Sequence, residues 1–223
     1  MPRLASAEAS AAERRMMVDC QLRTFEITDR AVLAAFDTVP REAFAAPASV
    51  AFAYADRDVP ALGRTRRLMV APMPLARMIQ ALRLAPGARA LDVAGGAGYG
   101  AALLRELGAS VTALETEWDA GAANRLAGAA AARVECVSGA LPAGWAANAP
   151  YDAILVHGSL EREPEALIGQ LRDGGRLACG EVNGDCGRLV CYERLASGFR
   201  KRAIVDARLP PLLEFALEPV FVF

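Results

Sequence analysis

The stretch Ala88–Gly100 constrains this chain more than any other. The run Ala90-Leu91-Asp92-Val93 is apolar except for its one acid. It is followed by Ala94-Gly95-Gly96-Ala97-Gly98 and then by Tyr99-Gly100. Glycine allows sharp bends and lets a ligand approach the backbone closely. Residues 101–107 have helical spacing and end before a glycine. The stretch therefore predicts a strand, a ligand-binding turn and a helix whose positive dipole end faces the ligand.

A second predicted strand, residues 110–114, ends in Glu115. In Rossmann-like folds an acid at the end of the second strand accepts hydrogen bonds from ribose hydroxyls. The two strands and the turn thus predict half of a Rossmann-like nucleotide site, with Glu115 placed for a pair of hydroxyls. A solvated acid at a strand end is the structural alternative.

The charge of Asp92 distinguishes between two nucleotides. Gly96-x-Gly98-x-x-Ala101 also fits the dinucleotide fingerprint, which would indicate an NAD-dependent oxidoreductase. A carboxylate just before the turn would repel a pyrophosphate, whereas it would attract the amino group of S-adenosylmethionine. The sequence therefore favours S-adenosylmethionine, with the dinucleotide and a glycine turn without a ligand as alternatives.

Composition limits the remaining classes. The chain has 223 residues and 54% hydrophobic content, enough for one globular unit. A net charge of −1 argues against a general nucleic-acid surface, and no apolar segment approaches membrane-spanning length. Five cysteines without metal-ligand spacing predict no metal site and favour a reducing, cytoplasmic location. The sequence does not specify an oligomeric state.

The order of expected elements predicts an α/β fold with a mostly parallel sheet and an antiparallel C-terminal part. Helices are expected at 6–22, 31–36, 74–84, 101–107, 117–132 and 164–171. Further strands are expected at 133–137, 150–156, 176–179 and 188–192, with an edge strand at 213–223. Residues 1–84 are expected to form a helical N-terminal extension and an acceptor-side loop, packed against a nucleotide-binding part at 85–223. The helical part, up to residue 44, is expected to have no partner strands, and residues 47–67 are expected to form a loop long enough to be functional.

Short blocks spread over most of the chain occur in a recognisable order. They are Met17-Val18-x-x-Gln21-Leu22, Ile27-x-Asp29, Val32-Leu33-x-Ala35-Phe36, Val39-Pro40-Arg41-Glu42-x-Phe44, Ala53-Tyr54-x-Asp56, Ala71-Pro72, Leu91-Asp92-Val93, Gly98-Tyr99, Pro150-Tyr151-Asp152-Ala153-Ile154 and Gly174-Gly175-Arg176-Leu177. In this order they resemble the protein-L-isoaspartate (D-aspartate) O-methyltransferase family. The resemblance implies a class I methyltransferase sheet, S-adenosylmethionine as cofactor, and a protein or peptide acceptor with a free carboxylate.

The resemblance also implies roles for single residues on the cofactor side. Glu115 would accept hydrogen bonds from the ribose of the cofactor, and Ser138 and Gly139 would border its adenine. The methionine end of the cofactor would be held by Asp92 and by the turn residues Ala94, Gly95, Gly96 and Gly98. Two of these positions depart from the family. Ala94 stands where the family has its first loop glycine, and Ser138 stands where the family usually has an acid.

The acceptor side departs further. Leu68-Met69-Val70 replaces a Thr-Ile-Ser run of the family, so the hydroxyls that contact the acceptor and cofactor are absent. A carboxylic acid with a pKa of about 4 is already ionised at neutral pH, so methyl transfer to it depends on alignment rather than on a base. We therefore expect a methyltransferase with altered acceptor specificity, or a catalytically silent cofactor-binding or regulatory homologue.

Two further side chains could contribute to the chemistry. Arg67, at the end of a basic stretch, could hold an acceptor carboxylate through its guanidinium, or it could be solvated. His157 follows the predicted strand at 150–156, at the sheet edge where ligands of open α/β sheets bind. It could act as a base for an acceptor that needs deprotonation, or be a structural histidine.

Overall fold

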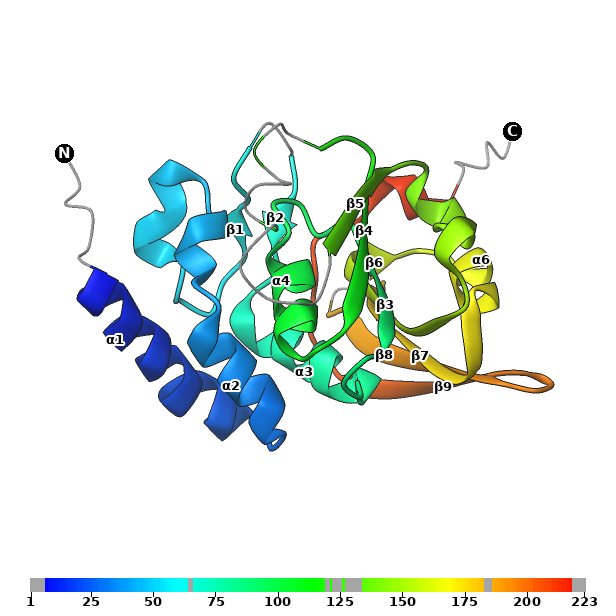
Figure 1. The fold of residues 1–223 in the computed structure, drawn as a ribbon, viewed down its shortest axis with the longest axis horizontal. Coiled ribbons are helices and arrows are strands. Elements are labelled where there is room, and N and C mark those ends of the chain that lie inside the picture. Colours follow the sequence, from blue (N-terminus) through cyan, green and yellow to red (C-terminus); the bar gives the residue numbers. More distant parts are fainter. Residues whose placement is uncertain are drawn as a thin grey trace.

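The computed structural model describes residues 7–63, 66–118, 121, 126, 134–182 and 186–217. Its centre is a seven-stranded sheet with the order β5-β4-β3-β6-β7-β8-β9. Helices lie on both sides of this sheet (Figure 1). The expected α/β class, mostly parallel with an antiparallel C-terminal part, is confirmed.

The first five strands along the sheet are parallel, and the last two are antiparallel to their neighbours. The strands are β3 (Arg89–Val93), β4 (Ser110–Glu115), β5 (Val134–Ser138), β6 (Tyr151–Leu160), β7 (Leu171–Glu181), β8 (Arg188–Leu195) and β9 (Gly198–Val205). In register, Val93 pairs with Val156 and Glu115 pairs with Ser138. The carboxyl ends of the strands that carry the predicted site residues therefore meet at one sheet edge.

The helices form two unequal layers. They are α1 (Ala7–Met17), which continues as a π-helical segment (Val18–Leu22), α2 (Arg30–Thr38), α3 (Pro72–Leu82), α4 (Tyr99–Glu106) and α6 (Glu165–Gly169). The Asp29 carboxylate caps α2 by accepting the Ala31 N–H at 2.8 Å. In Figure 1 the N-terminal helices, α3 and α4 lie to one side of the sheet and α6 to the other.

Successive side chains of the central strands pack into two different core clusters, one on each face of the sheet. Ala90, Ala153 and Leu155 belong to the core cluster that contains α3, α4 and the N-terminal helices. Leu91 and Ile154, one residue out of phase, belong to the second cluster with α6. Successive side chains of a strand point to opposite faces, so these nearly all-apolar strands require two covering layers.

Two expectations about elements need correction. The expected loop at 47–67 is not irregular throughout, because β1 (Val59–Pro60) lies within it and pairs antiparallel with β2 (Leu68–Met69), which lies just after it. The edge strand expected at 213–223 is wrong for Leu213–Phe215, which form a 3₁₀ turn, and residues 218–223 lie outside the described ones. The edge strand is instead β9. Most of its side chains are exposed, so its sequence lacks the alternation of apolar and polar residues that marks a half-buried strand. The helix expected at 117–132 lies mostly outside the described residues.

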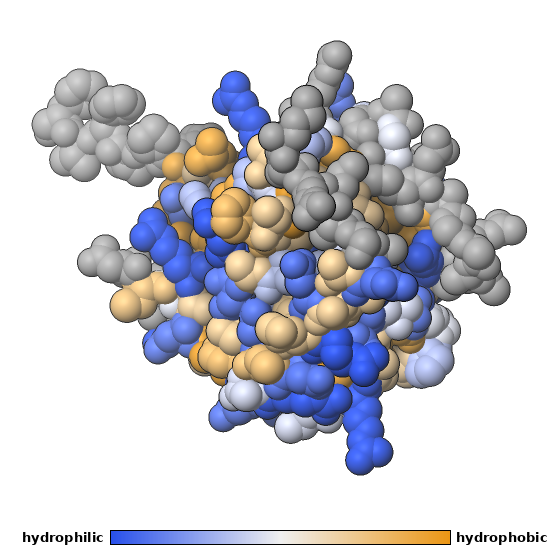
Figure 2. All heavy atoms as spheres, turned by 90° about the vertical axis from the view of Figure 1, so that its left-hand side faces the viewer, coloured by the Kyte–Doolittle hydropathy of each residue, from blue (hydrophilic) through white to orange (hydrophobic). Residues whose placement is uncertain are grey.

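On the face formed by the N-terminal elements, hydrophobic and hydrophilic residues are interspersed (Figure 2). None of the helices in the described part of the chain is both long and apolar enough to cross a membrane. The same residues contain no cluster of three or more histidine, cysteine or acidic side chains that could hold a metal. All five cysteines are described, and none forms a disulfide.

Candidate cofactor site

The glycine turn leads from β3 directly into α4. Gly96 and Gly98 have φ values of 62° and 95°, in the left-handed region that glycine adopts without a steric penalty. Gly98 is the residue that precedes the first turn of α4. Ala94 also lies in this region, with φ of 61°, although it is not glycine. Three of the five residues of the turn therefore have a left-handed backbone, and one of the three is an alanine.

Asp92 lies under this turn and is only 1% exposed. Its Oδ1 lies 2.6 Å from Nε2 of His157. Its Oδ2 is buried and has no hydrogen-bond partner among the described residues. A Cβ at Gly95 would lie 2.3 Å from Oδ2, so the oxygen faces the turn at a point where only glycine fits. A buried acceptor without a donor is costly, and this one fits an amino group placed against the turn.

Glu115, at the end of β4, is 2% exposed and reaches back to the same turn. Its Oε1 accepts the Gly96 N–H at 2.7 Å, and its Oε2 accepts from Thr116 N–H at 3.3 Å and from Arg67 Nε at 3.2 Å. Burial raises the pKa of this carboxyl, and the Arg67 guanidinium and the Gly96 N–H oppose the rise. Glu115 is therefore a buried carboxylate that connects the end of β4 with the glycine turn and with Arg67.

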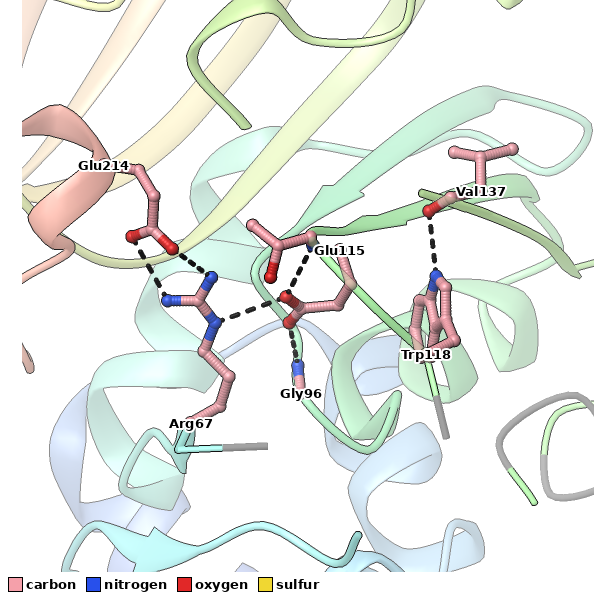
Figure 3. Close-up of polar contacts among 7 residues, drawn as sticks. Arg67, Gly96, Glu115, Trp118, Val137 and Glu214 are labelled. Atoms are coloured by element: carbon pink, nitrogen blue, oxygen red, sulfur yellow. Dashed lines mark hydrogen bonds and ion pairs between the residues drawn. The ribbon is translucent and has the colours of Figure 1, made fainter. Parts of the chain in front are cut away.

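Arg67 connects Glu115 with a residue far along the chain (Figure 3). Its Nη2 and Nη1 donate to the two carboxylate oxygens of Glu214 at 2.7 and 3.3 Å. Burial favours the neutral guanidine, but Glu214 and Glu115 outweigh it and raise the pKa of Arg67. The guanidinium therefore stays charged between two carboxylates.

The region expected to border the adenine lies beside Glu115. The Gly139 N–H donates to the Glu115 carbonyl at 2.9 Å, and Ser138 is exposed. The indole of Trp118 donates to the Val137 carbonyl at 2.8 Å, so it lies against the same strand end (Figure 3). Trp118 was not among the residues expected at the site, although its position three residues after Glu115 could have indicated it.

The side chains of the acceptor-side run, Leu68-Met69-Val70, differ in their exposure to solvent. Leu68 is 37% exposed, whereas Met69 and Val70 are buried. Behind them lies Arg41, which is fully buried and donates to the carbonyls of Ala53 at 2.7 Å and Met69 at 3.4 Å. At the two positions where the resemblance implies hydroxyls, this chain therefore has one exposed and one buried aliphatic side chain.

The structure thus brings Asp92, His157, the glycine turn and Glu115 together at one sheet edge. It also brings Arg67 from the acceptor side onto Glu115. Sequence reasoning named these residues but not the pairing of Asp92 with His157. It did not name Glu214, which no motif marks and which only the return of the C-terminal segment places near Arg67.

These features define a class: a Rossmann-like sheet with one acid at the glycine turn and a second at the ribose position is typical of S-adenosylmethionine-dependent methyltransferases. Residues 12–201 match the sequence profile of the Protein-L-isoaspartate(D-aspartate) O-methyltransferase (PCMT) family. A Gloeobacter violaceus protein-L-isoaspartate O-methyltransferase is 40% identical over 200 residues, which cover 88% of this chain and 96% of that protein. The chain therefore belongs to the protein-L-isoaspartate (D-aspartate) O-methyltransferase family, and the expected resemblance is confirmed.

Two solved structures agree in fold. A protein-L-isoaspartate O-methyltransferase matches with a TM-score of 0.73 and 22% identity, over 89% of this chain and 65% of that one. A Plasmodium falciparum beta-aspartate methyltransferase, solved in complex with S-adenosyl-L-homocysteine, matches with a TM-score of 0.70 and 20% identity, over 90% of this chain and 98% of that one. At these identities the two likenesses show the fold alone.

Proposed function

We propose that this protein is an S-adenosylmethionine-dependent methyltransferase that methylates a free carboxylate of an isoaspartyl protein or peptide. The observation that carries the proposal is the buried Oδ2 of Asp92, which lacks a donor and faces Gly95 of the turn. An amino group there would supply both the missing hydrogen bond and the opposite charge.

The other residues of the site have complementary roles in this proposal. Glu115 accepts hydrogen bonds from the ribose hydroxyls, and Ser138 and Gly139 border the adenine. The left-handed turn at Gly96 and Gly98 lets the backbone approach the ligand. His157 acts as a positioning residue, because its contact with Oδ1 fixes the Asp92 carboxylate while Oδ2 stays available. A role for His157 as a base is not needed for a carboxylate acceptor.

When bound, S-adenosylmethionine supplies a sulfonium methyl group that a carboxylate oxygen can attack. The chain contributes alignment of the two reactants and exclusion of water around the buried Asp92 and Glu115. Leu68 and Val70 provide no hydroxyl to orient the acceptor. A lost hydrogen bond to a charged group costs about 1.5 to 3 kcal/mol, a loss that lowers the rate or shifts the acceptor preference.

Two measurements test the proposal. Calorimetry should show one S-adenosylhomocysteine bound per chain, and Asp92→Asn should weaken that binding at least tenfold. Methyl transfer from labelled S-adenosylmethionine to an isoaspartyl peptide should exceed transfer to the matched aspartyl peptide. Failure to bind S-adenosylhomocysteine at millimolar concentration would refute the cofactor assignment.

Binding without methyl transfer would instead support the catalytically silent homologue, which the aliphatic Leu68 and Val70 favour. The proposal includes a cytoplasmic location, because the five thiols form no disulfide, as is typical of a reducing compartment.

A further inference from the structure

The Arg67 side chain lies directly over the glycine turn. A Cβ built on Gly96 would be 3.0 Å from the Arg67 Cβ and 3.6 Å from its Cγ. The same atom would be 3.1 Å from the Cβ of Ala61, the residue whose N–H donates to the Arg67 carbonyl at 3.1 Å. The segment that carries Arg67 therefore covers the surface of the turn against which a bound nucleotide would lie.

The hydrogen bonds of Glu115 lead to the same conclusion. A carboxylate offers about four lone-pair positions, two on each oxygen. In this structure Oε2 accepts from Arg67 and Thr116, and Oε1 accepts from Gly96. One position is left, whereas two ribose hydroxyls need two. Of the three donors, the backbone N–H groups belong to the turn and to the strand end, so the side chain of Arg67 is the one that can move aside.

Glu214 makes such a movement feasible. It binds both terminal nitrogens of Arg67, whereas Glu115 binds only Nε. A guanidinium that leaves Glu115 therefore keeps its two-point contact, and no partly buried charge is left unpaired. Glu115 in turn exchanges one charged donor for two hydroxyl donors.

We propose that Arg67 is a gate on the cofactor site: it competes with the cofactor ribose for Glu115, and cofactor binding transfers it fully to Glu214. This inference rests on the proposed function, since it assumes that Glu115 is the ribose acid. The gate lowers cofactor affinity, and it couples occupation of the cofactor site to β2, which begins at the next residue.

The test is calorimetric titration of S-adenosylhomocysteine into the full chain and its variants. Arg67→Gln should bind about tenfold more tightly than wild type, as expected for removal of one charge-assisted competitor. Arg66→Gln, which removes an equal charge from an exposed neighbouring side chain, should leave the affinity unchanged. The gain should disappear when the probe is an analogue that lacks both ribose hydroxyls.

Arg67→Gln leaves two carboxylates close together, so Arg67→Gln/Glu214→Gln, which removes one charge of each sign, serves as a second variant. It should show the same gain, with unfolding midpoints confirming that both variants fold. Unchanged or weaker binding by the folded Arg67 variants, with wild type still binding, would overturn the gate alone. No binding by wild type or by either variant would overturn the cofactor assignment and the gate together.

Discussion

His157 Nε2 lies 2.6 Å from Asp92 Oδ1, although 65 residues separate the two side chains in the sequence. Both are buried: Asp92 lies near the carboxyl end of β3, and His157 lies within β6, one residue beyond the last pair that β6 forms with β3. The sequence predicts that this strand ends before His157, whereas β6 continues to Leu160. The contact occupies one carboxylate oxygen and leaves the other facing the glycine turn. It therefore orients the buried carboxylate so that one whole oxygen, Oδ2, remains available as an acceptor.

Replacing His157 should weaken cofactor binding through Asp92 rather than abolish methyl transfer. His157→Ala removes the partner of Oδ1, and we expect S-adenosylhomocysteine affinity to fall about tenfold, the equivalent of one hydrogen bond to a charged group. His157→Gln, which keeps a donor, should recover part of the affinity. A large fall in the maximal rate with unchanged cofactor affinity would indicate a base instead.

Gly100 should be intolerant of a methyl group for the same reason. A Cβ there would lie 2.3 Å from Nε2 of His157 and 2.7 Å from Oδ1 of Asp92. Gly100→Ala should therefore separate the pair and lower S-adenosylhomocysteine affinity at least tenfold in calorimetry. Gly169→Ala is the matched control, because a Cβ at Gly169 meets nothing within 4 Å. Equal affinities of the two variants would contradict the geometry.

Ala94→Gly should stabilise the protein, against the usual effect of glycine. Ala94 has φ of 61°, and a left-handed backbone costs a non-glycine residue about 1 kcal/mol. Ala34, exposed in the middle of α2, provides the opposite case, where glycine should destabilise by about 1 kcal/mol. Urea unfolding of both variants should give changes of opposite sign. A loss of stability in Ala94→Gly would show that the strain is relieved elsewhere.

Arg41 should be essential for stability. Its side chain is fully buried, burial lowers the pKa of its guanidinium, and the guanidinium carbon lies 5.1 Å from the centre of the Tyr99 ring. Arg41→Met would leave the carbonyls of Ala53 and Met69 without these donors. We expect a loss of about 3 kcal/mol in urea unfolding. Arg23→Met, at an exposed ion pair with Asp19, should change stability by less than about 0.5 kcal/mol.

Cofactor binding should depend on pH through Glu115. Burial raises the pKa of this carboxyl above its ordinary value of 4.5, and only the ionised form can accept both ribose hydroxyls. Affinity for S-adenosylhomocysteine should therefore fall as the pH is lowered through that raised pKa, and the fall should begin above the range of an exposed glutamate. Glu115→Gln should bind S-adenosylhomocysteine weakly, and its affinity should not show this fall at low pH. Superimposable pH profiles of wild type and Glu115→Gln would contradict the assignment.

Local patterns predicted much of the fold because the elements concerned are specified locally. The apolar strand β6, the amphipathic α3 and the glycine turn are each recognisable from residues a few positions apart. β9 was missed because its first six residues are exposed on both faces, so neither burial nor alternation marks that part of the strand. The pairing of β1 with β2 was missed because two-residue strands carry no periodic signal.

The sequence by itself determined the family, the Rossmann-like sheet, and the two acids at its glycine turn, because strand ends and glycines act within a few residues. Tertiary structure decided which side chains those acids meet. His157 comes to Asp92 because β6 pairs with β3, and Arg67 joins Glu115 to Glu214 because the C-terminal segment returns across 147 residues. Contacts between such distant positions depend on how the whole chain packs, which no short stretch of sequence encodes.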